Sequence, residues 1–279
     1  MLPVLRRGAH GPDVEQLQKR LSKAGFPPGR IDGRFGFGTE AALLAFQHSH
    51  ELLADGTAGP ITWHALGRIG DGLPADRSGD INPEFVAEMF PFTPLQSIRR
   101  HLPAVLAGLR AAGLVDKPML LVALATIRAE SEGFAPVGEA PSRFNTSPHG
   151  HPFDLYDLRR DLGNLGAPDG ERFRGRGFVQ LTGRANYLRY GEALDQGDLL
   201  VRKPQLAGEP GLAGRILASF LADRQRPIKQ ALLDDDLARA RRMVNGGTHG
   251  LERFTAAYRT GQALLPDEVW PDTARRGAA

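Results

Sequence analysis

Two glutamates are the candidate catalytic residues of this chain. Glu130 follows an apolar stretch that ends at Ile127, and Glu139 lies in a segment rich in Gly and Pro. At about 100° per residue, Glu130 continues the apolar face of a predicted helix from Pro118. A carboxyl group at the edge of an apolar face loses hydration, which raises its pKa and favours the protonated form. A general acid for glycoside cleavage needs that protonated form.

Glu139 could supply the second carboxylate, because a loop position lets it fold back across a cleft. One carboxylic acid would protonate the glycosidic oxygen, and a carboxylate on the opposite face would activate water. From these residues alone, each glutamate has a plainer alternative: a solvated helix end for Glu130 and an exposed loop acid for Glu139. Glu132 lies about 200° further round the helix and should face elsewhere.

Two later segments are rich in glycine and polar residues, and we expect them to line a site: Phe173–Gly183 (FRGRGFVQLTG) and Val244–Gly247 (VNGG). Glycines let the backbone approach a ligand closely. Three arginines in the first segment or next to it could meet acidic groups of a ligand: Arg172, Arg174 and Arg176. Their alternative is a solvated loop or a buried ion pair, and a structural role suits Arg176 best. Thr182 could also cap a helix that starts near Arg184.

An internal repeat marks residues 1–69. The residues Asp32, Gly33, Gly36 and Thr39 recur at a constant offset as Asp55, Gly56, Gly59 and Thr62. Each copy predicts a tight Asp-Gly turn that leads into a helix. Before the repeat, an apolar stripe predicts another helix, capped by Asp13 and ended by Gly25.

The text VEQLQKRLSKAGF, IDGRFGFGTEAALLAFQ and ADGTAGPITWHAL resembles the three-helix peptidoglycan-binding domain of wall hydrolases. The resemblance implies a shallow groove near the repeat turns for the peptide stem or glycan of peptidoglycan. We expect Asp32, Phe35, Thr39 and Trp63 to line it. The alternative places Trp63 in the core and makes Thr39 a helix cap.

Three more distant motifs resemble the family-19 glycoside hydrolases, the chitinase-like group that includes bacteriophage endolysins: AESEGFAPVGE, FRGRGFVQLTGRANYLRYGEAL and VNGGTHGLERF. The resemblance implies that Glu130 is the catalytic acid and Glu139 the second carboxylate, with Thr182 holding the water or that carboxylate. It also implies sugar subsites, for which we expect Gln180, Asn186, Tyr187, Asn245 and Arg176. Glu132 departs from the pattern, since many relatives have glycine there.

These observations predict an all-α protein with two modules. Residues 1–69 would be the three-helix peptidoglycan-binding domain, residues 70–84 a linker, and residues 85–279 a lysozyme-like helical catalytic domain. The predicted function is that of an endolysin that hydrolyses β-1,4 bonds of peptidoglycan, most simply an N-acetylmuramidase. The alternatives are a chitinase, a lytic transglycosylase and a binding protein without activity.

Composition narrows the other possibilities. The chain has no cysteine, so disulfides and thiolate chemistry are excluded. His149 and His151, near Asp154, lie in a Gly/Pro turn without a convincing third ligand, and we expect neither metal nor cofactor. The net charge of +3 suits an anionic polymer, but the arginines do not form a recognisable nucleic-acid module.

We expect a monomer without stable membrane association, because no stretch approaches the ~20 apolar residues of a membrane span. The N-terminal residues lack the pattern of a signal peptide. The protein is therefore expected to be made in a host cytoplasm and to reach the periplasmic wall after membrane permeabilisation. An injected antibacterial toxin would have the same sequence features.

Overall fold

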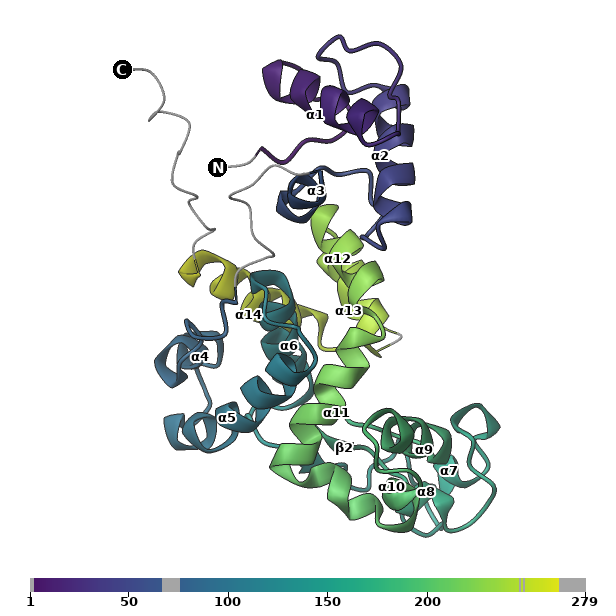
Figure 1. Cartoon of the computed structure of the whole chain (residues 1–279). Helices are drawn as coiled ribbons and strands as arrows, with labels where there is room; N and C mark the ends of the chain where they lie inside the picture. Colours follow the sequence, from purple (N-terminus) through teal and green to yellow (C-terminus); the bar gives the residue numbers. More distant parts are fainter. Residues whose placement is uncertain (1–2, 67–75, 246, 248, 266–279) are drawn as a thin grey trace. The chain divides into compact units, whose positions relative to one another are not determined.

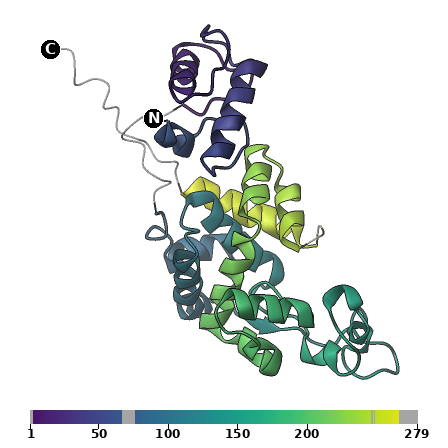
Figure 2. The same ribbon diagram turned by 45° about the vertical axis from the view of Figure 1, so that its right-hand side comes forward.

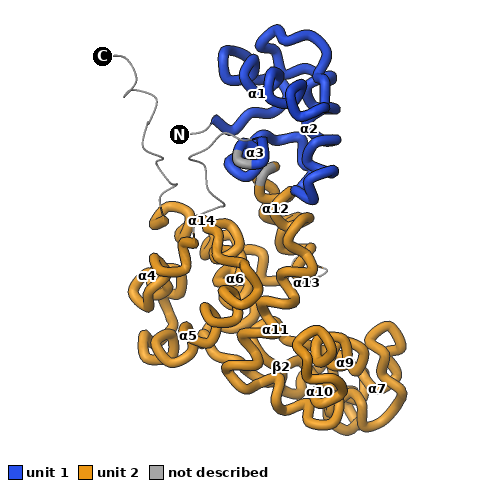
Figure 3. The backbone as a smooth tube through the Cα atoms, in the orientation of Figure 1, with its two compact units in different colours: residues 1–75, 266–279 blue, residues 76–265 orange. Residues whose placement is uncertain are grey.

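The computed structural model describes residues 3–66, 76–245, 247 and 249–265. The chain divides into two compact units, residues 1–75 with 266–279 and residues 76–265 (Figure 3). The described residues are mainly helical, which confirms the predicted fold class (Figure 1). Their one sheet pairs β1 (Val137–Gly138) with β2 (Arg176–Gly177), antiparallel. No helix among the described residues has the length and apolar character needed to cross a bilayer.

Residues 3–66 of the first unit form three helices, as predicted: α1 (Pro12–Lys23), α2 (Phe37–Ser49) and α3 (Pro60–Ala65). Their apolar faces enclose a core that includes Leu17, Phe46 and Trp63. The predicted cap at Asp13 is wrong, because α1 begins one residue earlier and its N-cap is Gly11. Gly11 has a φ of 118°, a backbone conformation that glycine adopts without steric cost.

Two buried glutamines explain the internal repeat. The Gln18 amide donates to Asp32, to the Arg34 carbonyl and to Thr39, and its oxygen accepts from the backbone of the Asp-Gly turn. Gln47 makes the corresponding contacts with the second turn, through Asp55, Thr57, Thr62 and the Gly56 backbone. Each Asp-Gly turn is therefore held by one glutamine side chain from the preceding helix.

The second unit is built around α6 (Lys117–Glu130), in which every residue from Met119 to Ala129 is buried. The helix begins at the N-cap Asp116, whose carboxylate accepts from the Met119 amide at 3.2 Å. The other elements are α4 (Pro83–Met89), α5 (Leu95–Ala111), α7 (Asp154–Asp157), η1 (Arg160–Leu162), α8 (Asp169–Arg172), α9 (Arg184–Ala193), α10 (Leu199–Arg202), η2 (Pro204–Gly208), α11 (Pro210–Ala222), α12 (Gln225–Leu233), α13 (Leu237–Asn245) and α14 (Leu251–Leu264). Helices α4, α11, α12 and α14 pack against α6.

A second, smaller core lies among the helices between α7 and α11, which gather beside α11 in both views of the ribbon (Figures 1 and 2). It contains Phe173, Leu181, Tyr187 and Tyr190. Val179 contacts both this core and the larger one around α6. The QLTG motif, residues 180–183, therefore follows directly on the connection between the two cores.

Part of the predicted linker belongs to the second unit, which begins at Asp76. Ser78 and Ile81 are buried, and the Ser78 hydroxyl accepts from Arg110 at 2.8 Å. Asn82 caps α4 by accepting from the Phe85 amide. Residues 76–84 are thus packed, although their composition is typical of a linker, and residues 70–75 lie outside the described residues.

Helices α5 and α11 touch backbone to backbone at a pair of glycines. A Cβ atom added to Gly108 would lie 2.3 Å from the Gly214 carbonyl oxygen, and one added to Gly214 would lie 2.3 Å from the Ala104 oxygen. We expect Gly108→Ala to push the helices apart and to lower the free energy of unfolding by ~1–3 kcal/mol, the usual cost of overpacking.

Denaturant unfolding of the second unit would measure this loss. Gly211→Ala is the matched control, because a Cβ atom there meets nothing within 4 Å and alanine favours helix over glycine. Equal stability of the two variants would contradict the close-contact explanation.

We expect Gln18→Leu to destabilise the first unit by ~2–3 kcal/mol, because it leaves buried backbone groups of the first Asp-Gly turn without a partner. Fluorescence of Trp63 during denaturation would report this, in a Trp270→Phe background that removes the other tryptophan. Gln16→Leu, at a partly exposed position of the same helix, should change stability far less.

Candidate active site

Glu130 is the last residue of α6, at the point where the buried helix ends. Its side chain is 15% exposed, and its Oε1 atom lies 2.7 Å from the Nη2 atom of Arg241 on α13. Arg241 is fully buried, and its Nε atom donates to the His249 carbonyl at 3.0 Å. Apolar packing is therefore only part of the environment of Glu130, which also has a buried cation as partner.

The Val244–Gly247 motif leads into a loop that lies against this end of α6. A Cβ atom at Gly250, where φ is 71°, would lie 2.9 Å from the Ala129 carbonyl oxygen. Glycine at this position lets the loop approach the residue before Glu130. Asn245 ends α13, but its side chain lies outside the described residues, so its predicted sugar contact stays a prediction.

Glu132 lies on the surface with partners of its own. Its carboxylate accepts from Arg128 at 3.0 Å and lies 3.5 Å from Arg253. The hydrogen bond from Arg128 and the charge of that arginine lower the pKa of Glu132. The extra glutamate of the motif is thus an ionised surface residue, paired with different arginines from the one that holds Glu130.

Glu139 follows β1 and receives three hydrogen bonds. Its Oε1 atom accepts from the Asn145 amide and the Tyr156 hydroxyl, both at 2.9 Å, and its Oε2 atom accepts from the Gly175 backbone at 3.1 Å. Burial and the neighbouring Glu139 raise the pKa of Tyr156 to about 12, so its hydroxyl remains a donor at neutral pH. The carboxylate is therefore fixed in one orientation by neutral donors.

Three of the predicted catalytic and sugar-binding side chains lie close to Gly175. A Cβ atom there would lie 2.7 Å from the Gln180 Oε1 atom, 3.2 Å from the Glu139 Oε2 atom and 3.3 Å from the Thr182 Oγ1 atom. The structure thus brings Glu139, Gln180 and Thr182 to one place. A Cβ atom at position 175 would displace the Gln180 side chain and crowd the other two.

Thr182 and Gln180 are held by the backbone around them. The Thr182 hydroxyl donates to the Gln180 carbonyl at 2.9 Å, and the Gln180 amide donates to the Val137 carbonyl at 3.0 Å. The predicted cap role of Thr182 is wrong, because Gly183 is the N-cap of α9 and the Arg184 amide at the start of that helix donates to the Asn164 side chain at 2.9 Å. Asn186 donates to the Thr182 carbonyl, which ties this residue to the same loop.

Phe134 is a buried residue of the segment that connects the two glutamates. It is buried in a left-handed conformation with φ of 45°, in the loop between Glu130 and Glu139. Its ring packs against Phe90, with centroids 5.0 Å apart, and against Phe178, at 6.3 Å. Phe178 lies two residues before the QLTG motif, so this aromatic contact joins the loop between the two glutamates to the segment that leads into that motif.

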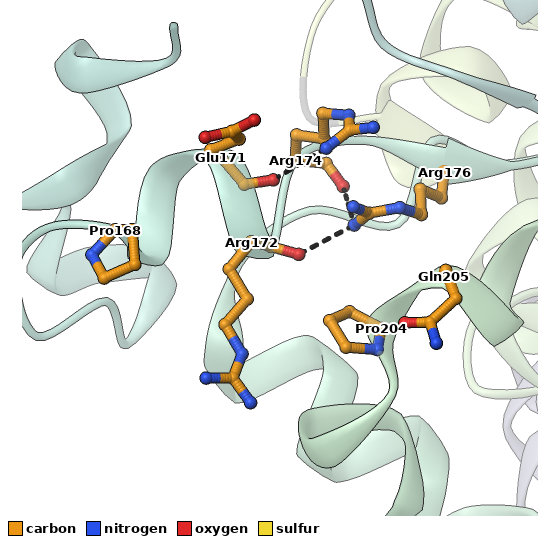
Figure 4. Close-up of a pocket in the computed structure, with 7 residues that line it drawn as sticks. All are labelled: Pro168, Glu171, Arg172, Arg174, Arg176, Pro204 and Gln205. Atoms are coloured by element: carbon orange, nitrogen blue, oxygen red, sulfur yellow. Dashed lines mark hydrogen bonds between the residues drawn. The ribbon is translucent and has the colours of Figure 1, made fainter. Parts of the chain in front are cut away.

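Tyr187 contradicts the prediction that it lines a sugar subsite. It is fully buried, its ring packs edge-on against Phe173, and its hydroxyl accepts from Arg176 and donates to the Arg174 carbonyl. Burial raises the pKa of its hydroxyl. Tyr187 supports the site from the core, whereas Arg176 also lines an open pocket (Figure 4).

In the first unit, two of the residues predicted to line the groove are core residues. Trp63 is fully buried and donates to the Pro3 carbonyl at 2.8 Å, and Thr39 is 2% exposed and bonded to Gln18. Asp32 holds the Asp-Gly turn, and the hydrogen bond from Gln18 lowers its pKa. These contacts contradict the groove prediction for Trp63 and Thr39 and give Asp32 a structural role.

A shallow pocket of about 390 Å³ is nevertheless present in this unit. It is lined by Gly8, Ala9, His10, Arg34, Phe35 and Gly36. Phe35 thus lies at a concave surface although its side chain is only 2% exposed. The sequence reasoning overlooked Phe37, which is 76% exposed beside this pocket wall and has the Arg7 guanidinium 4.6 Å from its ring centroid.

Comparison with known proteins identifies the first unit. Residues 10–66 match the family model PG_binding_1, a peptidoglycan binding domain. A stretch of 63 residues is 51% identical to the spore cortex-lytic enzyme of Bacillus cereus, covering 23% of this chain and 24% of that enzyme. A stretch of 69 residues is 42% identical to the N-acetylmuramoyl-L-alanine amidase CwlM of Mycobacterium tuberculosis, covering 23% and 17% of the two chains. The chain therefore spans about a quarter or less of these relatives.

Solved structures with some similarity include chitinase C from Streptomyces griseus, with a TM-score of 0.47 and 20% identity over 68% of this chain and 79% of that one. The endolysin of the Burkholderia AP3 phage has a TM-score of 0.27 and 20% identity over 94% and 100% of the two chains. The family match is confined to the first unit, and it places residues 10–66 in the peptidoglycan-binding domain family, as the sequence resemblance predicted.

Proposed function

We propose that the protein is a cell-wall hydrolase that cuts β-1,4 glycosidic bonds of peptidoglycan, most simply as an N-acetylmuramidase. The family match in residues 10–66 supports peptidoglycan as the substrate. The observation that carries the proposed chemistry is the pair of carboxylates with opposite surroundings, Glu130 at the end of a buried helix and Glu139 on a loop among neutral donors.

In this proposal Glu130 donates the proton to the leaving oxygen. Arg241 contacts its Oε1 atom, and among the described residues no hydrogen bond is made by the Oε2 atom, which leaves that oxygen to carry and deliver the proton. Arg241 would then act as a positioning residue, because its buried guanidinium fixes the direction of the carboxyl group. As the bond breaks, the same cation would stabilise the carboxylate that forms.

Glu139 would act as the second carboxylate. Asn145, Tyr156 and the Gly175 amide orient it, so its remaining lone pairs can accept a proton from an attacking water. The Thr182 oxygen, beside the same glycine, is placed to accept a hydrogen bond from that water. Gln180, whose amide oxygen also faces Gly175, would contact the sugar.

We expect Glu130→Gln to lower the rate of sacculus lysis by at least ~100-fold, because general-acid catalysis typically contributes that much. Turbidity loss of purified sacculi measures the rate, and circular dichroism shows whether the fold is kept. Glu132→Gln is the matched control two residues away. It removes only a surface ion pair with Arg128, so the rate of lysis should stay nearly unchanged. A folded Glu130→Gln protein with full activity would rule out the assignment.

Glu139→Gln separates hydrolysis from transglycosylation. A hydrolase should release fragments with muramic acid at the reducing end and lose most activity in this variant, since no carboxylate activates water. A lytic transglycosylase needs one acid/base group, would release 1,6-anhydro ends and would tolerate the change. Mass spectrometry of the soluble fragments distinguishes the two, and activity on chitin oligomers without activity on sacculi would favour a chitinase.

A further inference from the structure

Three arginines surround a pocket of about 370 Å³ in the second unit. Its walls come from the end of α8, the segment before β2 and the start of η2, and they comprise Pro168, Glu171, Arg172, Arg174, Arg176, Pro204 and Gln205 (Figure 4). The lining contains three guanidinium groups and one carboxylate, that of Glu171. The pocket therefore has a positive charge that nothing in the proposed glycosidic chemistry uses.

Arg176 is the buried cation of this pocket. Its side chain is 8% exposed, and its Nη1 atom donates to the Arg172 carbonyl at 2.8 Å and the Arg174 carbonyl at 3.3 Å (Figure 4). The same Nη1 atom also donates to the Tyr187 hydroxyl at 2.8 Å. These acceptors are neutral. Within the described part of the chain, no carboxylate lies within ion-pair distance of Arg176. A guanidinium this buried is usually compensated by an anion, so the pocket is suited to bind one.

Arg172 and Arg174 are held in place without ion pairs among the described residues. Arg172 donates to the Val201 carbonyl at 3.0 Å and lies over the Phe173 ring, and Arg174 donates to the Glu171 carbonyl at 3.1 Å and lies over the Phe153 ring. Their guanidinium groups point in different directions at the two sides of the pocket (Figure 4). Side chains fixed in this way lose less entropy when they bind an anion.

The pocket adjoins the proposed active site through one residue. Gly175 lies between Arg174 and Arg176, and its amide donates to Glu139. Glu139 and two arginines of the pocket are therefore direct neighbours of the same residue. The sugar chains of chitin and of peptidoglycan lack charge at neutral pH apart from their substituents, whereas the peptide stem of peptidoglycan carries carboxylates. A four-residue stem spans at most ~13 Å, enough to reach from the glycan to a neighbouring pocket.

We propose that the Arg176 pocket binds a carboxylate of the peptide stem and so selects peptidoglycan over uncharged glycans. The proposal rests on the proposed function, because it assigns a substrate contact to the same site. Arginine suits this task, since its planar guanidinium can bind a carboxylate through two parallel hydrogen bonds.

The test compares two substrates made from the same sacculi: intact sacculi, and glycan strands from which an amidase has removed the stems. We expect the double variant Arg172→Gln/Arg174→Gln to lower the cleavage rate of intact sacculi about tenfold, the effect of losing a charge-assisted contact. Its rate on stripped strands should equal that of the unmodified protein. An equal loss on both substrates, or no loss on either, would overturn the proposal.

Arg189→Gln/Arg202→Gln is the matched control, because it removes the same charge from two exposed arginines that pair with Asp223 and Asp198. It should leave the ratio of the two rates unchanged. A change in that ratio as large as that of the pocket variant would show that net charge alone is responsible, and would also overturn the proposal.

Direct binding separates this proposal from the proposed function. The Glu130→Gln protein is titrated with the free stem tetrapeptide and with the same peptide whose carboxylates are amidated, and binding is followed by calorimetry. We expect heat with the free acid and none with the amide, and loss of that heat in Arg176→Lys, which keeps the charge but not the planar fork. Binding of the free acid to this variant, together with no cleavage of either substrate by the unmodified protein, would retain the pocket and reject the hydrolase, whereas no binding would reject the pocket.

Discussion

The site depends on the burial of α6 along most of its length. Helices α4, α11, α12 and α14 cover this helix, so every residue from Met119 to Ala129 is removed from solvent. Glu130 is the first residue after this buried run that is partly exposed. The packing of the large core therefore sets both where the candidate acid lies and how little it can move.

The two candidate carboxylates are held by different physical means. Glu130 faces a buried guanidinium that is supplied by a helix 111 residues further along the chain. Glu139 faces an amide, a hydroxyl and a backbone N–H group, none of which is charged. Two groups of the same chemical type thus have distinct surroundings, which is the usual basis for distinct roles in acid–base chemistry.

Sequence reasoning located the helices and the glutamates because these depend on local patterns. The apolar stretch before Glu130 predicted a helix, and the Asp-Gly pairs of the repeat predicted tight turns. The structure has a buried helix at the first position and two turns bonded to glutamine side chains at the others. Arg241, Asn145 and Tyr156 were missed, since no spacing along the chain indicates which distant side chain will contact a given carboxylate.

The errors have a common physical origin. Trp63 and Tyr187 have side chains that suit both a sugar surface and a core, and only the three-dimensional packing decides between them. Threonine is a common helix cap, but the Thr182 hydroxyl donates to the Gln180 carbonyl instead. The segment from Asp76 to Glu84 has a linker composition, yet Ile81 and Ser78 supply enough buried surface to fix it.

The glutamine contacts of the repeat also bear on the order in which the chain folds. Gln18 bonds to residues 14 to 21 positions away, and Gln47 to residues 8 to 15 positions away. Contacts between near neighbours in sequence form with a small loss of chain entropy and favour fast folding, whereas the Arg241–Glu130 pair closes a loop of 111 residues. During synthesis the three helices between Pro12 and Ala65 can therefore reach their native state while Arg241, the partner of the candidate acid, has yet to leave the ribosome.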